Sequence, residues 1–253
     1  MAHPIIPWPG GKRRLLKYLL SDIPDHKAYV EVFAGGAALL LAKEPAPAEV
    51  VNDNDGELIR LYRCVQHHLD ELVRQFRWAL VSREMFRWTQ LQHPDTLTDI
   101  QRAARFYYMQ KLCFGGKAKG RTFGVAAAAP PRLNLLRMEE DLSQAHMRLA
   151  RVTIEHLEWR ACVDRYDRAG SLFFFDPPYW ETLGYSRDFG PEQYALLADT
   201  LATMKGKAIL TINDHPEMAR TFRQFRTQKV RIKYTVGGNG RGGETGELIV
   251  RNW

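Results

Sequence analysis

Short apolar strands alternate with helices near both ends of this chain, and this alternation limits the fold more than any other feature of the sequence. The expected strands occupy residues 27–33, 49–52, 152–156, 171–175, 208–212, 229–236 and 247–251. Helical patterns lie between them, and one of these begins near Pro191, because proline suits the first turn of a helix. Such alternation predicts an α/β fold with a mostly parallel sheet.

The middle of the chain has a helical pattern instead. Apolar side chains recur at three- and four-residue steps over residues 58–76, which predicts one long amphipathic helix. A second helix is expected over residues 99–112. We therefore expect residues 1–57 and 148–253 to form one sheet-based domain, with residues 58–147 as a mainly helical insertion in it.

The composition is that of a globular protein, with 45% hydrophobic and 26% charged residues. No apolar run approaches the roughly 18 residues that a membrane span needs, and no secretory signal is visible at the N-terminus. The three cysteines, Cys64, Cys113 and Cys162, form no CxxC pair. This pattern argues against a disulfide scaffold or a zinc ribbon, so we expect a cytoplasmic protein without a membrane or metal partner.

The net charge of +7 is concentrated in two stretches without acidic residues, 101–138 and 219–243. The first holds eight basic side chains: Arg102, Arg105, Lys111, Lys117, Lys119, Arg121, Arg132 and Arg137. Aromatic residues are interleaved with them, which suits phosphate contacts combined with base stacking. A solvated basic face that serves solubility is the alternative interpretation.

The apolar strand 171–175 runs directly into Asp176-Pro177-Pro178-Tyr179. Polar groups at the end of such a strand lie at the carboxyl edge of the sheet, where ligands bind in open α/β folds. The Asp176 carboxylate and a rigid carbonyl, that of Pro177, could accept both hydrogens of an exocyclic amine on a planar base stacked on Tyr179. This would localise the lone pair and make the nitrogen a better nucleophile. A turn capped by Asp176 is the structural alternative.

Two further segments bring glycines close to candidate ligand groups. A strand, a glycine turn and a helix follow one another over residues 30–39, and the glycines would allow close backbone approach. Asp53 ends the next strand and is placed for ribose hydroxyls, with a helix-capping role as the alternative. Near the N-terminus, Trp8 and Lys12 flank a tight turn, and the lysine could meet a carboxylate.

Taken together, these segments resemble the Dam-type (D12 class) DNA adenine-N6 methyltransferases. The matching blocks, in family order, are WPGGK (Trp8–Lys12), EVFAGGAAL (Glu31–Leu39), NDND (Asn52–Asp55), DPPY (Asp176–Tyr179) and GGNGRGGETGELI (Gly237–Ile249). The resemblance implies a Rossmann-like sheet dependent on S-adenosylmethionine, a helical DNA-recognition insertion, and no metal.

The resemblance also implies three groups of site residues. It assigns catalysis to Asp176, Pro177, Pro178 and Tyr179. It assigns cofactor binding to Trp8, Gly11, Lys12, Glu31, Phe33, Gly35, Asp53, Phe175 and Asp176, with Lys12 near the carboxylate of the cofactor and Asp53 on its ribose. The DNA contacts would come from Lys111, Phe114, Lys117, Lys119, Arg121, Asn239 and Arg241.

One segment departs from the family pattern. Members that read GATC carry an Asn-Arg pair followed by an aromatic, Asn-Gly stretch, whereas residues 110–124 here are rich in glycine and lysine. Reading a base requires specific side chains at fixed positions, and lysine and glycine suit phosphates better. A shorter or relaxed target sequence is therefore a hypothesis for this chain.

The resulting hypothesis is methyl transfer from S-adenosylmethionine to N6 of an adenine flipped out of double-stranded DNA by a monomer or weak dimer of bacterial or phage origin. Cytosine-N4 methylation and a non-catalytic DNA-binding regulator are the alternatives. RNA as the substrate is less favoured. A nicotinamide dehydrogenase is disfavoured because the GxGxxG spacing is absent.

Overall fold

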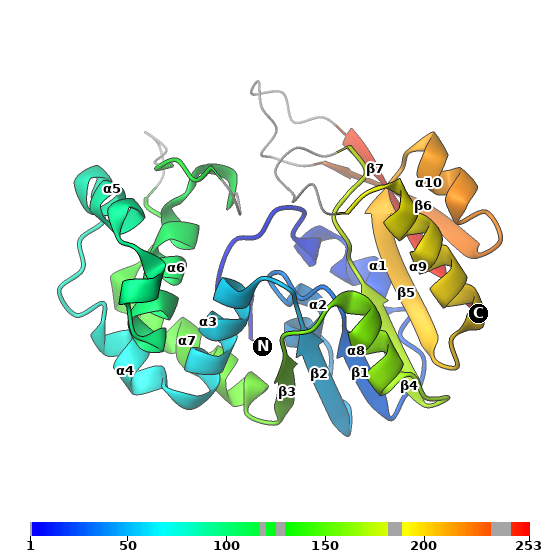
Figure 1. Ribbon diagram of the computed structural model, residues 1–253, viewed down its shortest axis with the longest axis horizontal. Helices are drawn as coiled ribbons and strands as arrows, with labels where there is room; N and C mark the ends of the chain where they lie inside the picture. Colours follow the sequence, from blue (N-terminus) through cyan, green and yellow to red (C-terminus); the bar gives the residue numbers. More distant parts are fainter. Residues whose placement is uncertain (1, 117–119, 125–129, 182–188, 234–243) are drawn as a thin grey trace.

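The computed structural model describes residues 2–116, 120–124, 130–181, 189–233 and 244–253 (Figure 1). In this part of the chain, seven strands form one sheet in the order β3-β2-β1-β4-β5-β7-β6. The strands are β1 (Ala28–Glu31), β2 (Ala48–Asn52), β3 (Val152–Glu155), β4 (Ser171–Phe175), β5 (Lys207–Asn213), β6 (Arg226–Lys233) and β7 (Glu244–Arg251).

The sheet is mostly parallel, as the sequence predicts. β1 pairs in parallel with β2 on one side and β4 on the other, and the β2–β3 and β4–β5 pairs are also parallel. β7 runs antiparallel to both of its neighbours, β5 and β6. The strand order reverses between β1 and β4, and ligands of open α/β sheets bind beyond the carboxyl ends of strands at such a switch point.

Helices separate most of these strands, and several follow one another between β2 and β3. They are η1 (Lys12–Arg14), α1 (Leu16–Leu20), α2 (Ala38–Ala42), α3 (Gly56–His67), α4 (Leu69–Arg74), α5 (Arg83–Leu91), η2 (Pro94–Thr96), α6 (Asp99–Leu112), η3 (Phe114–Gly116), α7 (Leu135–Leu149), α8 (Trp159–Tyr166), α9 (Pro191–Thr203) and α10 (Pro216–Thr221). The start of α9 at Pro191 and the bounds of α6 agree with the prediction.

The prediction of one long helix over residues 58–76 is wrong. The chain leaves helical geometry at His68, where φ is −135° and ψ is 38°, and α4 starts in a new direction. Phe76 then lies edge-on against Tyr107 of α6, with the ring centres 5.5 Å apart. Tertiary packing of the apolar face therefore takes precedence over a continuous helix.

Other boundaries also differ. The first helical segment of the chain is divided into η1 and α1. The strand expected over 229–236 begins earlier, as β6, and residues 234–236 lie outside the described part of the chain.

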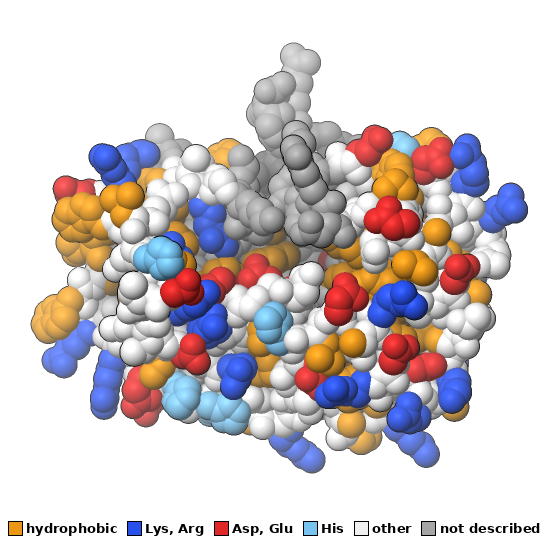
Figure 2. Space-filling view, viewed as in Figure 1, with side chains coloured by type: hydrophobic (Ala, Val, Ile, Leu, Met, Phe, Trp, Pro, Cys, Tyr) orange, Lys and Arg blue, Asp and Glu red, His pale blue; other side chains and the backbone are white. Residues whose placement is uncertain are grey.

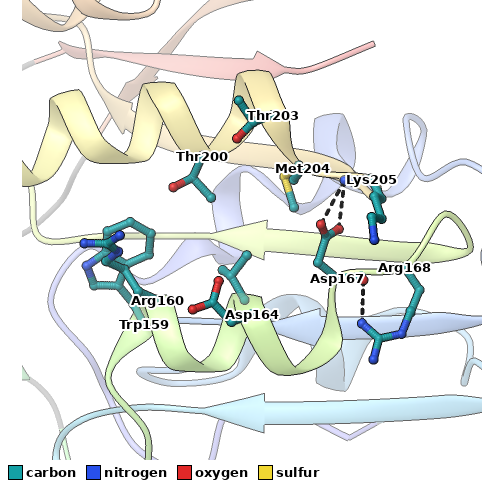
Figure 3. A pocket seen from close by; sticks show the side chains of 10 residues that line it. Trp159, Arg160, Asp164, Asp167, Arg168, Thr200, Thr203, Met204 and Lys205 are labelled. Carbon is teal, nitrogen blue, oxygen red and sulfur yellow. Dashed lines mark hydrogen bonds between the residues drawn. The ribbon is translucent and has the colours of Figure 1, made fainter.

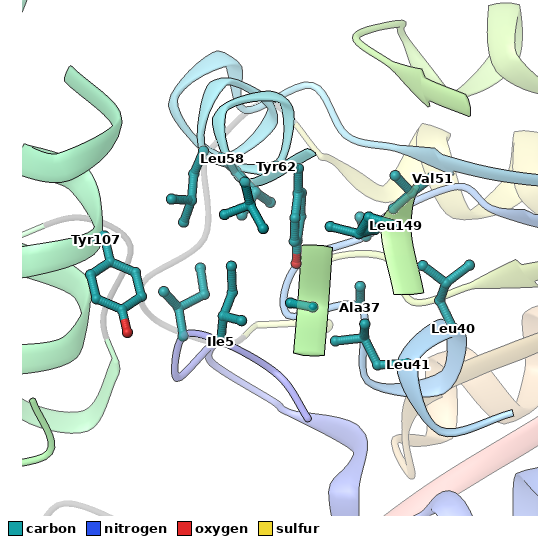
Figure 4. Close-up of a cluster of buried hydrophobic side chains, with 14 of the residues drawn as sticks. Ile5, Ala37, Leu40, Leu41, Val51, Leu58, Tyr62, Tyr107 and Leu149 are labelled. Carbon is teal, nitrogen blue, oxygen red and sulfur yellow. The ribbon is translucent and has the colours of Figure 1, made fainter. Parts of the chain in front are cut away.

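Alternate residues of the sheet pack into two hydrophobic clusters, one on each face. On one face Tyr29, Val51 and Phe174 pack with α1, α2, α3, α6 and α7. On the other face Val30, Phe173 and Phe175 pack with α8, α9 and α10. Figure 4 shows part of the first cluster, in which side chains of the sheet, of α2 and of the helical segment lie together. Both faces are therefore covered, as expected for parallel strands.

The helices α3–α7 lie between β2 and β3 in sequence and form a block at the left of the sheet in Figure 1. Side-chain caps fix the starts of α3, α5, α6 and α7. Asp55 accepts bonds from the Glu57 and Leu58 amides at the start of α3, and Thr98 and Gln101 form a capping box at the start of α6. The first cluster continues from the sheet into this block, and the division at residues 57 and 148 remains a prediction.

Candidate active site

The end of β4 delivers the Asp176 carboxylate to the switch point. Its Oδ1 accepts two donors, Lys12 Nζ at 2.7 Å and Thr211 Oγ1 at 2.9 Å. Within the described residues no hydrogen bond reaches Oδ2, and the side chain is 20% exposed. The carboxylate is thus anchored through one oxygen and keeps the other for a further partner.

Lys12 joins the N-terminal turn to the acceptor motif. Its side chain is 3% exposed, and its ammonium also donates to the Gly10 carbonyl at 2.6 Å. The same ammonium lies 4.5 Å from the ring centre of Tyr179. Burial raises the pKa of Asp176 above its ordinary value, and the nearby Lys12 charge and the bond from Thr211 oppose that rise. Two blocks that lie far apart in the sequence therefore form one electrostatic unit.

Hydrogen bonds from three elements hold the residues that follow Asp176. The Tyr179 hydroxyl donates to Glu247 of β7, a residue that is 1% exposed. The Asn213 side chain at the end of β5 accepts from the Trp180 amide at 3.0 Å and donates to its carbonyl at 3.1 Å. The Tyr194 hydroxyl donates to the Pro178 carbonyl at 2.7 Å. The loop is therefore fixed before any ligand binds.

Among the described residues, the two proline carbonyls of this loop differ in their hydrogen bonds. Tyr194 occupies the Pro178 carbonyl, whereas no hydrogen bond from a described residue reaches the Pro177 oxygen. This agrees with the predicted acceptor pair, the Asp176 carboxylate and the Pro177 carbonyl. The use of this pair by a substrate stays a prediction.

The glycine turn after β1 packs directly against an aromatic ring. Gly35 has φ +47°, and a Cβ at this position would lie 2.6 Å from Cδ1 of Trp8. The Gly35 amide donates to Oδ2 of Asp53 at 3.0 Å, and its carbonyl accepts from the Tyr62 hydroxyl at 2.6 Å. Trp8, Gly35 and Asp53 come from three separate sequence blocks, and the fold brings all three together.

Burial perturbs the two acidic residues beneath this turn. Asp53 lies in the protein interior, and burial raises its pKa to about 6, against the effect of its bonds from the Gly35 and Asp55 amides. Burial raises the pKa of Glu31 to about 8, although its Oε2 accepts from the Tyr29 hydroxyl and the Leu40 amide. Asp53 therefore holds the turn and Glu31 holds the first residues of α2. The capping role considered for Asp53 falls to Asp55.

The other predicted cofactor residues lie around the same edge. The Gly11 amide donates to the Trp8 carbonyl at 3.1 Å and so closes the N-terminal turn. Phe33 is half-buried and packs edge-on against Phe189, with the ring centres 5.7 Å apart. The Phe175 side chain is buried in the core beside α8 and α9. Contact of these residues with a cofactor remains a prediction.

The segment expected to recognise DNA forms a short hairpin after α6. Cys113 and Phe123 make an antiparallel bridge, and the Phe114 amide donates to the Thr122 carbonyl at 2.8 Å. Phe114 itself is 57% exposed at the base of η3. An exposed aromatic residue on this hairpin suits the predicted DNA contact.

The predicted basic contacts of this hairpin differ in their surroundings. Lys111 is half-buried, with its ammonium 5.4 Å from the Tyr107 ring centre, and burial lowers its pKa. Arg121 is also half-buried, lies over the Phe106 ring and donates to Gln110. Four other predicted DNA contacts lie outside the described residues: Lys117, Lys119, Asn239 and Arg241.

Part of the charge in the basic segment is used inside the fold. Arg102 pairs with Glu57 at 2.5 Å and with Asp95 at 2.9 Å, and Arg105 donates to the Thr89 and Gln90 carbonyls. On the described part of the face shown in Figure 2, lysine and arginine side chains lie on both the helical block and the sheet domain. Charge counting along the sequence therefore overstates how many of these side chains are available for phosphates.

A separate pocket of about 350 Å³ lies between α8 and α9, away from the switch point (Figure 3). Its Asp167 carboxylate accepts from the backbone amides of Lys205 and Gly206, so it serves the loop before β5. Acidic and basic side chains mix along its lining. We assign it no part in the site at the carboxyl edge.

The fold and the site together define an α/β enzyme in which a glycine turn after β1 and an acceptor carboxylate after β4 meet at the switch point. The family model of the D12 class N6 adenine-specific DNA methyltransferases matches residues 8–235. The chain belongs to this family.

Curated relatives match over nearly the whole chain. The type II methyltransferase M.CviBI of Paramecium bursaria Chlorella virus NC1A is 26% identical over 261 residues, covering 99% of each chain. The type II methyltransferase M1.LlaDCHI of Lactococcus lactis subsp. cremoris is 24% identical, covering 99% of this chain and 95% of the relative. The DNA adenine methylase of Escherichia coli K12 is 23% identical, covering 92% and 88%.

Membership confirms the predicted fold class, the DNA adenine-N6 methyltransferase activity and S-adenosylmethionine as the cofactor. The cytosine-N4 and regulator alternatives gain no support from these relatives. No helix in the described part of the chain is long and apolar enough to cross a membrane. Nor do three or more potential metal ligands gather among those residues.

Sequence reasoning missed four residues that shape the site: Gln110, Asn213, Glu247 and Thr211. Gln110 is buried and donates to the carbonyls of Pro7 and Gly116. Asn213 and Glu247 stand opposite each other on β5 and β7. Polar residues inside or at the ends of apolar segments are the available signal, but their partners depend on the strand order.

Proposed function

We propose that this enzyme methylates adenine in double-stranded DNA after the base has been flipped into the pocket formed by Asp176 and Tyr179. The single observation that carries this proposal is that no described residue bonds Oδ2 of Asp176 or the carbonyl of Pro177, in a loop whose Tyr179 ring is held by Glu247. This acceptor pair matches the two hydrogens of an exocyclic amine on a planar base.

The residues at the switch point fit S-adenosylmethionine. The cradle of Gly35 under Trp8 leaves no room for a Cβ, and the buried Asp53 carboxyl lies directly behind it. Trp8, Gly35 and Asp53 would hold the nucleoside, and Lys12 would hold the carboxylate of the amino acid part. When bound, the cofactor supplies an electrophilic methyl group on a sulfonium.

The residues of the chain prepare the nucleophile. Asp176 Oδ2 and the Pro177 carbonyl accept the two N6 hydrogens, which localises the nitrogen lone pair out of conjugation with the ring. Tyr179 stacks on the base and fixes its plane, so the nitrogen is aligned for attack, and alignment supplies much of the rate. No covalent intermediate with the protein is needed. The proton can leave after transfer, so Asp176 need not act as a strong base.

The helical segment would hold the DNA. Phe114 is exposed on the hairpin and could fill the gap that the flipped base leaves in the duplex. Lys111, Lys117, Lys119 and Arg121, with Asn239 and Arg241 from the C-terminal block, would contact the backbone. We expect a relaxed or short target sequence, because glycine and lysine dominate this hairpin.

We also propose that the enzyme works as a monomer or weak dimer in the cytoplasm of a bacterium or of a cell infected by a phage or virus. Relatives from a virus, a phage and bacteria support this setting. Sedimentation of the purified chain, with and without duplex DNA, tests the oligomeric state.

The test of the reaction combines substitution with product analysis. Asp176→Ala should abolish methylation and leave the unfolding midpoint close to that of the wild type, while Asp164→Ala, an exposed control, should keep full activity. Mass analysis of nucleosides from treated DNA should give N6-methyladenine. Full activity of Asp176→Ala would reject the acceptor role, N4-methylcytosine would establish the alternative reaction, and no methyl transfer despite DNA binding would establish a regulator.

The target sequence needs a separate measurement. Plasmid DNA methylated by the enzyme should show modified adenines at many sites outside GATC when sequenced at single-base resolution. Methylation confined to GATC would reject the relaxed target.

A further inference from the structure

Thr211 is a polar residue in the centre of an apolar strand. It lies on β5 between Leu210 and Ile212, is 0% exposed, and stands opposite Ile249 of β7. A hydroxyl at such a position is costly to bury unless it has a hydrogen-bond partner, and a β-branched hydrocarbon would suit the strand better. The residue type therefore points to a specific partner.

That partner is the acceptor carboxylate. Thr211 Oγ1 donates to Oδ1 of Asp176 at 2.9 Å, and its distance to the Phe175 carbonyl is longer, at 3.4 Å. The ammonium of Lys12 approaches the same oxygen, Oδ1, from η1. With two donors on one oxygen, the carboxylate cannot rotate without losing both bonds, and Oδ2 stays directed away from them.

We propose that Thr211 is a positioning residue for methyl transfer, which holds the Asp176 carboxylate so that Oδ2 faces the exocyclic amine of the base. This inference rests on the proposed function of Asp176. Thr211 is fully buried behind the carboxylate, so it acts through Asp176 and not through contact with the base. Lys12 alone fixes the carboxylate less firmly, because a lysine ammonium can donate from many directions.

The matched pair Thr211→Val and Thr211→Ser separates the hydroxyl from its packing. Valine keeps the branched shape and loses the donor, whereas serine keeps the donor and loses a methyl group. Loss of a hydrogen bond to a charged group changes an equilibrium constant by on the order of ten- to hundred-fold. We expect Thr211→Val to lower kcat by roughly ten-fold, with KM for the cofactor within about two-fold of the wild type. Thr211→Ser should keep most of kcat.

The pH profile supplies a readout that a packing defect would not move. The bond from Thr211 lowers the pKa of Asp176, so its loss should move the acidic limb of kcat against pH to higher pH in Thr211→Val and not in Thr211→Ser. The other titratable groups facing this carboxylate from the described residues are Lys12 of η1 and Glu31 of β1. Glu247 of β7 faces the Tyr179 hydroxyl. None of these is altered in either variant.

Single-turnover methylation of a duplex with saturating S-adenosylmethionine, measured between pH 5 and 9, tests the inference with Asp176→Ala run in parallel. Slow transfer and a displaced acidic limb in Thr211→Val, with rescue in Thr211→Ser, support it. An inactive Asp176→Ala together with a Thr211→Val of wild-type rate overturns the role of Thr211 alone. Equal losses in both Thr211 variants also overturn it, since packing would then be the cause. An active Asp176→Ala overturns the proposed function itself.

Discussion

Replacing Gly35 by alanine tests whether the contact between the glycine turn and Trp8 serves cofactor binding more than stability. The new Cβ would lie 2.6 Å from Cδ1 and 2.8 Å from Nε1 of Trp8, whereas carbon atoms in contact are separated by roughly 3.5–4.0 Å. The Trp8 indole would therefore have to move by about 1 Å. The φ of +47° adds about 1–2 kcal/mol for a residue with a Cβ. We expect a loss of about 1–3 kcal/mol in the free energy of unfolding.

Gly35→Ala should also weaken cofactor binding, and we expect this to be its main effect on the enzyme. Trp8 is a proposed cofactor contact, and a displacement of about 1 Å at such a contact can cost about 10²-fold in function. Calorimetric titration with S-adenosylmethionine should show a Kd raised at least ten-fold, and urea unfolding gives the stability in the same samples.

The neighbouring glycine provides the matched control. At Gly36 a Cβ would lie 3.5 Å from the Trp8 Cβ and 3.7 Å from the Ile6 carbonyl oxygen, which are ordinary contact distances. We therefore expect Gly36→Ala to bind the cofactor within about three-fold of the wild type. A wild-type Kd in Gly35→Ala, or equal losses of affinity in both variants, would show that the Trp8 contact does not control cofactor binding.

Three further predictions concern charge. Glu49→Gln should lower the free energy of unfolding, measured in urea, by about 3–5 kcal/mol. Arg148 binds both carboxylate oxygens of Glu49, at 2.5 and 2.9 Å, and would lose this buried charged partner. A change below about 1 kcal/mol would contradict the prediction. Glu31 has a folded-state pKa of about 8, above its ordinary value, so its contribution to stability is lost as pH rises from about 5 to 8. The stability of Glu31→Gln relative to the wild type should rise over this window by up to about 1.4 kcal/mol per pH unit, and a constant difference would exclude a protonated Glu31. Arg132 is exposed, so Arg132→Ala should reduce the slope of log K for DNA binding against log salt concentration by about one unit. Arg102 is paired with Glu57 inside the fold, so Arg102→Ala should leave this slope unchanged. Equal slopes in the two variants would show that burial does not decide phosphate contact.

The sequence predicts those parts of the fold that local pattern determines. β4 has the predicted bounds because its side chains are apolar on both faces, and α9 begins where Pro191 is expected. The bend at His68 was not predictable, since the apolar spacing continues across it. The direction of α4 depends instead on the position of α6, which is a tertiary contact.

The candidate site also has parts that the sequence predicts and parts that it does not. Blocks of chemistry-bearing residues, such as Asp176 with its prolines or Gly35 in its turn, are visible in the sequence because each is local. The hydroxyl of Tyr179 reaches Glu247 only because β7 inserts between β5 and β6, and nothing in the sequence alone specifies that order. The motifs can therefore be predicted from the sequence, but the residues that hold them in place cannot.

Gln110 links the hairpin that we propose binds DNA to the candidate site at the edge of the sheet. Its buried amide nitrogen donates to the Pro7 carbonyl at 2.8 Å, next to Trp8, and to the Gly116 carbonyl of the hairpin at 2.7 Å. Its oxygen accepts from Arg121 at 3.0 Å. One side-chain amide thus uses its donor and its acceptor to join the N-terminal loop at Pro7 to both arms of the hairpin. Because an unpaired buried amide would be costly, the two parts cannot separate here without losing these bonds. The basic segment therefore supplies Gln110, which holds the hairpin against the N-terminal loop, as well as positively charged side chains.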